Sequence, residues 1–357
     1  MSDKPDQVVI ERFVRHGFAR RPAQTVVEAT RLTTAIQAQE PAAARLGVRA
    51  RSAGTTEADV LAAIETDRSV VRTWLMRATI HLVAASDVRW LTALLGPAFA
   101  RKFRKRWIDL GLTEEVLAGT AQALPDVLSA GPLTRHEIMA GLCDHGIAID
   151  GADESAAHVL LHATGLGLVC RGPERGRDAT FALLDQWVPE GGDGPRGDEA
   201  LALLARRFFQ AFSPATAADF TTWSGLASTA AIALIRDELT SVEVAGRAAY
   251  SLGVSQPQRG VRLVPGFDNF LVGYRDRDLI IDPALRDRVF LGGIIRPTVL
   301  RDGRVIGTWR LSRKARRAEI EVTYFAPISR ALRIAVDAEG ADIERFIGQP
   351  TDMRQSG

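Results

Sequence analysis

The sequence predicts an α+β fold in which three tandem winged-helix domains precede a small, β-barrel-like C-terminal domain. The first observation is a repeated pattern. Segments with apolar residues at helical spacing are followed by a pair of β-rich runs three times before residue 256. The second observation is a change from Val261 onward, where short strands succeed one another. The length of 357 residues leaves room for two to four small domains, in agreement with this division.

The overall composition is that of an ordinary globular protein. Hydrophobic residues make up 46% of the chain and charged residues 25%, and no apolar run approaches the ~20 residues needed to span a bilayer. Residues 1–6 lack the apolar core of a signal peptide. The two cysteines, Cys143 and Cys170, indicate no disulfide framework. We therefore expect a cytoplasmic protein with no membrane attachment.

The first predicted domain, residues 1–112, combines helices with one hairpin. Its expected elements are helices over 6–20, about 26–36 and from 55, strands over 69–75 and 78–84, and a long helix from 86. Gly96-Pro97 marks the position where that long helix would break. The basic run Arg101–Trp107 either contacts phosphates or forms a solvated face with its two aromatic residues turned inward. The sequence leaves both interpretations open.

The second predicted domain, residues 113–190, has the clearest winged-helix order. Helices are expected over 114–129, from 134 to about 144 and over 153–164, followed by strands over 167–171 and 180–184. The third helix usually enters the major groove in this fold, but here it contains no Arg or Lys, so we expect it to read bases poorly. His158 and His162 lie four residues apart on this helix. A complete ligand set is not recognised beside them, and we predict no metal site.

A linker and a third, shorter copy of the pattern follow. Residues 191–197 are rich in Gly and Pro, which is typical of a linker. The third predicted domain, residues 198–255, contains helices over 198–212, 216–224 and 228–238 and strands over 241–245 and 248–252.

The fourth predicted domain, residues 256–350, is rich in strands. The expected strands cover 261–264, 269–272, 290–295, 298–300, 304–310 and 319–325, before a helix over 329–347 and a frayed tail from 349. Asp302-Gly303 indicates a tight hairpin turn. The basic residues at this turn and the next are candidates for contact with a DNA backbone or minor groove, and the alternative is that they serve only solubility. They are Arg301, Arg304, Arg313, Lys314, Arg316 and Arg317.

Two glutamines in the first domain form the candidate catalytic pair. Gln37 and Gln39 are two residues apart, so they share a face only if the backbone there is extended. Pro41 pushes Glu40 out of the helical region, which favours a helix that ends near Ile36 and passes into a short extended segment. Two neighbouring amides can bind one water or one polar ligand. The alternative is that they cap the helix end or bond to backbone.

The segments around these residues resemble the bacterial winged-helix DNA glycosylases of the AlkZ and YcaQ family. The segments that carry the resemblance are 37–46, 72–83, 94–97, 265–277 and 290–293, and because they are spread along the sequence, the resemblance covers nearly the whole chain. The pair Gln37-Ala38-Gln39 is similar to the AlkZ branch, whereas the YcaQ branch has Gln-x-Asp at these positions. The resemblance implies a chain bent into a C shape around double-stranded DNA.

The resemblance also implies an activity. The expected protein is a monofunctional DNA glycosylase of DNA repair that hydrolyses the N-glycosidic bond of cationic N7-alkylated purines, including those in interstrand crosslinks, as alkylation repair or self-resistance. It assigns water positioning to Gln37 and Gln39 and support of the site or DNA contact to Arg77 and His81, although His81 fits a core histidine equally well. No cofactor is implied. We expect a monomer, because no dimerisation segment is evident. The alternative function is a non-catalytic winged-helix DNA-binding protein or transcriptional regulator.

Overall fold

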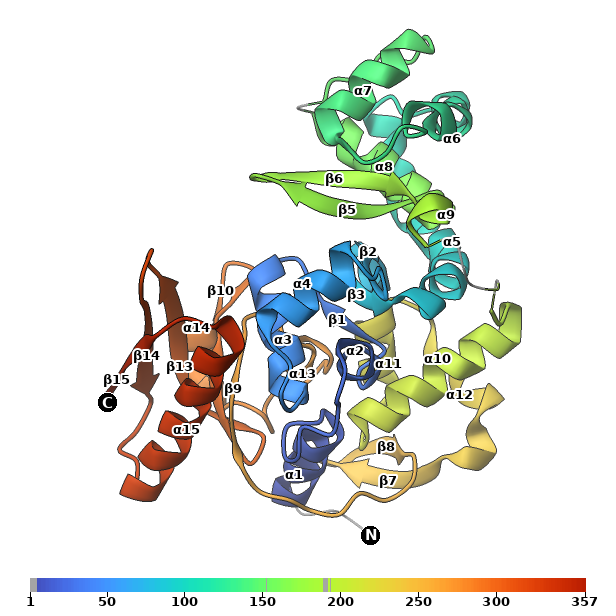
Figure 1. Cartoon of the computed structure of the whole chain (residues 1–357). Helices are drawn as coiled ribbons and strands as arrows, with labels where there is room; N and C mark the ends of the chain where they lie inside the picture. Colours follow the sequence, from blue (N-terminus) through green and yellow to red (C-terminus); the bar gives the residue numbers. More distant parts are fainter. Residues whose placement is uncertain (1–4, 152, 189–191, 193) are drawn as a thin grey trace. The chain divides into compact units, whose positions relative to one another are not determined.

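The structure is a computed structural model (Figure 1) that describes residues 5–151, 153–188, 192 and 194–357. The chain forms two compact units: residues 1–61 with 202–357, and residues 62–201. The first four residues lie outside the described residues, and so do residues 191 and 193 of the expected linker. Within the described part of the chain, no helix combines the length and the apolar character that crossing a membrane requires.

The second unit contains the order of helices and strands that the sequence predicts for a winged helix. Its elements from residue 85 are α5 (Ala85–Asp109), α6 (Glu114–Val127), β4 (Leu133–Thr134), α7 (Arg135–Asp144), α8 (Glu154–Gly165), β5 (Val169–Arg175), β6 (Asp178–Leu183) and α9 (Leu184–Trp187). Thr113, Thr134 and Asp153 start α6, α7 and α8 by accepting hydrogen bonds from N–H groups of the first turn. Buried leucine and isoleucine side chains, including Leu124 and Ile138, form the core between these helices.

The first predicted hairpin is confirmed. β2 (Val70–Trp74) pairs antiparallel with β3 (Ile80–Ala84), and the turn between them is a short 3-10 helix, Met76–Ala78. Within the second unit the strands lie in the order β3-β2-β5-β6-β4. This hairpin therefore extends the sheet formed by the β5–β6 wing.

The sequence suggested a break in helix α5 at Gly96-Pro97, but the helix continues through these residues without a break. A Cβ atom on Gly96 would lie 2.0 Å from the carbonyl oxygen of Gly165 on α8, so this glycine permits a close helix crossing. In the basic run, Trp107 is buried and Phe103 packs against the core, while the cations are exposed. The inward aromatic residues agree with the solvated-face interpretation, and the exposed cations remain accessible to phosphates, so both interpretations stay open.

The two histidines of α8 are engaged by neighbouring side chains. His158 Nδ1 accepts a hydrogen bond from the Trp107 indole N–H at 3.1 Å, and its Nε2 lies 3.2 Å from a carboxylate oxygen of Glu154. The sequence prediction overlooked this carboxylate, which also pairs with Arg106. Among the described residues, no group of three or more His, Cys, Asp or Glu side chains is placed to bind a metal ion.

The first unit joins the two ends of the chain. Its elements before residue 256 are α1 (Pro5–Arg15), α2 (Val26–Arg31), β1 (Ala35–Gln37), α3 (Pro41–Arg51), α4 (Glu57–Glu65), α10 (Gly197–Phe212), α11 (Ala217–Ser224), α12 (Ser228–Leu234), β7 (Thr240–Val244) and β8 (Arg247–Ser251). The helices and hairpin predicted for residues 198–255 are all present. Stacked and edge-on rings of Phe208, Phe212, Phe220 and Trp223 form the core between α10 and α11.

The C-terminal sheet is open, so the predicted barrel-like closure is wrong. Its five strands lie in the order β15-β14-β13-β12-β9. They are β9 (Val261–Val264), β12 (Thr298–Arg301), β13 (Arg304–Arg313), β14 (Ala318–Tyr324) and β15 (Thr351–Ser356). A barrel would require the edge strands β9 and β15 to pair with each other. Instead, helix α15 (Arg330–Ile347) packs its buried face against the sheet (Figure 1).

Two further expectations for this region are wrong. Asn269–Val272 is not a strand but the short helix α13, because the Asp268 side chain accepts a hydrogen bond from the N–H of Phe270 and starts a helical turn. The polar tail from Gln349 is not frayed, because it adds β15 in parallel to the edge of β14. The remaining elements are the two-stranded hairpin of β10 (Phe290–Leu291) and β11 (Ile294–Ile295), the helix α14 (Arg286–Val289) and the 3-10 turn Pro283–Leu285.

Candidate active site

Gln37 lies on a short extended segment, as the sequence predicts, whereas Gln39 follows in a bend beyond the end of the strand. Helix α2 ends at Arg31, before the expected end near Ile36, because Thr34 has a φ of +69° that interrupts a helix. Strand β1 follows, with Gln37 buried at 9% exposure and Gln39 exposed. Glu40 is extended (φ −104°, ψ 110°) before Pro41, which is the first residue of α3.

Asn269 binds the backbone of β1 with both ends of its side-chain amide. Its Oδ1 accepts a hydrogen bond from the N–H of Gln37 at 3.0 Å, and its Nδ2 donates to the carbonyl oxygen of Ala35 at 2.6 Å. The preceding residue, Asp268, receives two hydrogen bonds of 2.8 Å from the guanidinium of Arg51 at the end of α3. All five residues that take part in these hydrogen bonds are buried.

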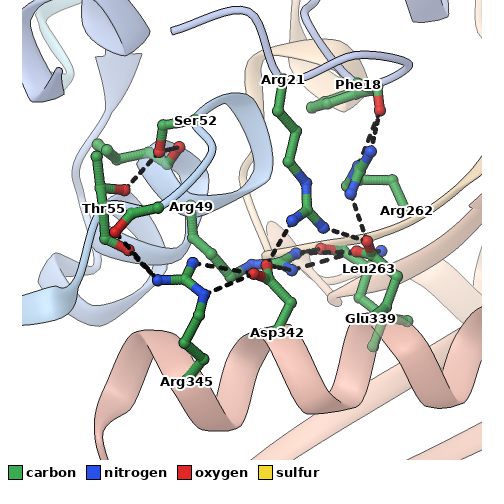
Figure 2. Close-up of polar contacts among 12 residues, drawn as sticks. Phe18, Arg21, Arg49, Ser52, Thr55, Arg262, Leu263, Glu339, Asp342 and Arg345 are labelled. Atoms are coloured by element: carbon green, nitrogen blue, oxygen red, sulfur yellow. Dashed lines mark hydrogen bonds and ion pairs between the residues drawn. The ribbon is translucent and has the colours of Figure 1, made fainter. Parts of the chain in front are cut away.

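A buried cluster of charges fixes α3 against the C-terminal helix (Figure 2). Glu339 on α15 pairs with Arg21, Arg49 and Arg262, and Asp342 one turn later lies 2.9 Å from Arg49. Burial alone would raise the pKa of Glu339, but Arg49, Arg262 and Arg21 outweigh this effect and lower its pKa. Both carboxyl groups therefore remain ionised at neutral pH, and the glutamine segment continues into a helix that is anchored at several points.

A cavity of about 630 Å³ begins at Glu40, next to the glutamine segment. Its lining includes the apolar residues Ala42 and Leu46 on α3 and the charged residues Arg296 and Arg310. Neither Gln37 nor Gln39 lines this cavity. Glu40 thus faces a space that the two glutamines do not share.

The structure places Arg77 and His81 in the second unit, on the β2–β3 hairpin. His81 is 2% exposed, and its Nδ1 donates a hydrogen bond to the carbonyl oxygen of Thr79 at 2.8 Å. Burial, followed by the nearby charge of Arg77, lowers the pKa of His81 to about 3, so the ring is neutral at physiological pH. Any contact of His81 with DNA would therefore be made by an uncharged imidazole. Arg77 has a φ of +58°, in the turn between the strands.

The basic residues of the C-terminal sheet form two separate groups. Arg301 and Arg304 flank the Asp302-Gly303 turn at one end of β13, and Arg313 begins the second group at the other end. Ten residues of strand separate the two ends by roughly 30 Å. The second group is exposed and contains Arg313, Lys314, Arg316 and Arg317.

The predicted Asp-Gly hairpin turn is confirmed, but its tip packs against helix α1. A Cβ atom on Gly303 would lie 2.5 Å from the carbonyl oxygen of Val9, and Arg304 pairs with Asp6 at 2.9 Å. Asp302 also accepts a hydrogen bond from the N–H of Gly260 at 2.8 Å. Entry of this tip into a DNA groove would require its separation from α1.

Sequence reasoning missed Asp268 and Asn269 as parts of the site. Their segment, residues 265–277, matched the family, but no role followed from its residue types. The signal was an acidic and an amide residue inside an otherwise apolar stretch that later proved to be buried. The separation of 232 residues between Gln37 and Asn269 hid their contact.

Comparison with known proteins defines the class of this protein. A family model described as "DNA glycosylase AlkZ-like" matches residues 30–346. The chain therefore belongs to the AlkZ-like DNA glycosylase family, and it is an enzyme of DNA repair.

A curated protein and a solved structure, both from Streptomyces sahachiroi, are similar to this chain over almost their full length. A protein named "Interstrand DNA cross-link repair glycosylase" is 29% identical over 362 residues, which cover 96% of this chain and 96% of the relative. The solved structure of "Streptomyces sahachiroi DNA glycosylase AlkZ" superimposes with a TM-score of 0.84 at 28% identity, covering 99% of this chain and 100% of that one.

Proposed function

We propose that this DNA glycosylase hydrolyses the N-glycosidic bond of cationic N7-alkylated purines in double-stranded DNA, including purines in interstrand crosslinks. Gln37 and Gln39 position the attacking water. The observation that carries the proposal is the buried, extended backbone of β1, which Asn269 binds from one edge and which ends at Gln37, two residues before the exposed Gln39. The name of the curated relative supports the crosslink part of the proposal.

We also propose a domain organisation and a set of DNA contacts for this enzyme. The enzyme acts as a monomer, with winged-helix domains at 1–112, 113–190 and 198–255 and a β-rich domain at 256–350. Arg77 and His81 support the site from the first hairpin. The arginines and the lysine at the two turns of β13 contact the DNA backbone, since guanidinium groups bond well to phosphate.

Two amides suffice for this reaction because the leaving group needs little help. Glutamine cannot act as a general base, but it can orient a water and stabilise developing charge through its dipole. A purine alkylated at N7 already carries a positive charge, so it departs as a neutral base without receiving a proton. The sugar passes through an oxocarbenium-like transition state that an oriented water can intercept.

The range of lesions tests this mechanism. Uracil leaves as an anion, and the only acid in the segment 36–41 is Glu40, which lines a cavity that neither glutamine lines. We expect release of N7-methylguanine and of a bulky N7 adduct from matched duplexes, and release of uracil at least about 10²-fold slower, the typical effect of one missing stabilising group. The released bases are quantified by chromatography. Efficient uracil release, or rejection of both cationic lesions, contradicts the mechanism.

Crosslinked purines follow from the same reasoning. A base tied to the opposite strand cannot rotate fully out of the duplex, as base-flipping enzymes require. An enzyme that brings its water to the sugar through a groove is free of this requirement. We therefore expect the enzyme to release crosslinked purines as well. Stoichiometric binding to DNA without any release of a base would instead support the alternative function as a regulator.

The enzyme should not cut the DNA strand after it releases the base. A lyase step needs an amine that forms a Schiff base with the abasic sugar, and the chain has only four lysines, Lys4, Lys102, Lys105 and Lys314. Lys102 donates to the carbonyl oxygen of Arg77 at 3.0 Å, and burial followed by the charge of Arg77 lowers its pKa. A lowered pKa favours a nucleophilic amine, so Lys102 is the lysine to test. We expect borohydride to trap no covalent adduct; an adduct that disappears with Lys102→Ala would reverse this conclusion.

A further inference from the structure

The geometry points to Asn269 as a positioning residue that sets the backbone of Gln37 for catalysis. This inference rests on the proposed role of the two glutamines. Asn269 is 1% exposed and lies on α13, far from Gln37 in sequence. It contacts the glutamine segment through the backbone N–H of Gln37 and the backbone carbonyl of Ala35, so we infer that it acts through Gln37 and not on the DNA.

The Asn269 amide takes the place of a neighbouring strand along one edge of β1. The N–H of Gln37 and the carbonyl of Ala35 point to the same side of an extended chain, where an adjacent strand would ordinarily bond to both. The Asn269 side chain satisfies both with one donor and one acceptor, at 2.6 Å and 3.0 Å. These two bonds fix the position and the orientation of the β1 backbone at Gln37, which bears the first catalytic amide.

Asn269 is itself fixed by its neighbours in the chain. Its carbonyl oxygen accepts the N–H of Gly273 at 2.8 Å, and Asp268 before it starts the helical turn. Gly266 approaches so closely that a Cβ atom there would lie 2.4 Å from the carbonyl oxygen of Ile295. The amide is therefore presented by a rigid turn and not by a mobile loop.

The same turn binds both ends of the glutamine segment. Asn269 bonds to Ala35 and Gln37 on β1, while Asp268 pairs with Arg51, the last residue of the helix that follows. The stretch from Gln37 to Arg51, which contains both catalytic glutamines, is therefore held at its two ends by neighbouring residues of one turn. Loss of the Asn269 contact alone would release β1 while the Asp268–Arg51 pair still anchors α3.

Replacement of Asn269 should slow base release without weakening DNA binding. A displacement of about 1 Å in a catalytic group can reduce a rate by roughly 10²-fold. We expect Asn269→Ala to lower the single-turnover rate of N7-methylguanine release by about 10- to 10²-fold at saturating enzyme, with the Kd for lesion DNA within twofold of the parent value.

Ser224→Ala is the matched control for lost stability. Ser224 is also 1% exposed and also makes one donated and one accepted hydrogen bond with backbone, to Phe220 and from Leu226. It lies at the end of α11 and has no contact with β1 among those that the structure describes. Both variants should lose similar thermal stability, but only Asn269→Ala should lose excision rate. Equal losses of rate in the two variants would overturn the inference, as would a parent-like rate for Asn269→Ala.

A second variant serves if Asn269→Ala does not fold. Asn269→Asp, assayed at pH 8, preserves the shape and the acceptor for the Gln37 N–H but removes the donor to Ala35. We expect its rate to fall at least fivefold with the Kd unchanged. A folded Asn269→Asp protein that excises at the parent rate contradicts the inference.

Comparison with Gln37→Ala separates the positioning role from the proposed function. If Asn269 acts through Gln37, adding Asn269→Ala to Gln37→Ala should cause less than a twofold further loss of rate, because coupled residues are not additive. A further tenfold loss would show that Asn269 acts by another route. If Gln37→Ala alone excises like the parent, the proposed catalytic assignment fails, whatever the result for Asn269.

Discussion

Replacing Gln37 and Gln39 together by alanine should abolish most of the excision activity. Losing an oriented donor or water-positioning group typically costs 10²–10³-fold in rate, and we expect a loss of at least that size for release of N7-methylguanine under single-turnover conditions. DNA affinity should remain, because the change removes no charge.

The fold should tolerate this double replacement. The bonds that join β1 to Asn269 use the backbone N–H of Gln37 and the carbonyl of Ala35, which alanine retains. Thermal melting and lesion-DNA binding measure whether structure and affinity persist. Gln24→Ala, at an exposed glutamine outside the site, is the control and should behave like the parent. Excision at the parent rate by the double variant would show that the site has been assigned wrongly.

Removing Asp268 should produce the largest loss of stability. Arg51 and Asp268 are both fully buried as side chains and lie 2.8 Å apart. Taking away one partner of a buried pair leaves an uncompensated charge, which costs about 3–5 kcal/mol. We expect Asp268→Ala to lower the free energy of unfolding of the first unit by this amount, measured by urea denaturation followed by tryptophan fluorescence.

Two comparisons show whether the buried charge is the cause. Glu238→Ala, which breaks the exposed pair with Arg206, should have an effect of less than about 1 kcal/mol. Replacing both partners by apolar residues, with Asp268→Leu and Arg51→Met, should recover much of the loss, because no unpaired charge remains. A loss below about 1 kcal/mol for Asp268→Ala would mean that Arg51 finds another partner or water.

The sequence by itself determined the local elements of this protein. Helical spacing predicts α6, spacing with the capping residue Thr134 predicts α7, and Asp302-Gly303 predicts its hairpin, because these signals act over a few neighbouring residues. Pro41 likewise determined the extended backbone of Glu40. The glutamine pair and the family could be recognised for the same reason, since both are read from short segments.

The tertiary structure alone decided how distant segments complete the site and the sheet. The predicted strand at 269–272 became a helix because of the Asp268 cap, and the polar tail became β15 because the edge of β14 offered unpaired backbone groups. Asn269 reached Gln37 only when the two ends of the chain packed into one unit. Hydrogen bonds between residues more than two hundred positions apart depend on packing, and no local pattern of residue types specifies their partners.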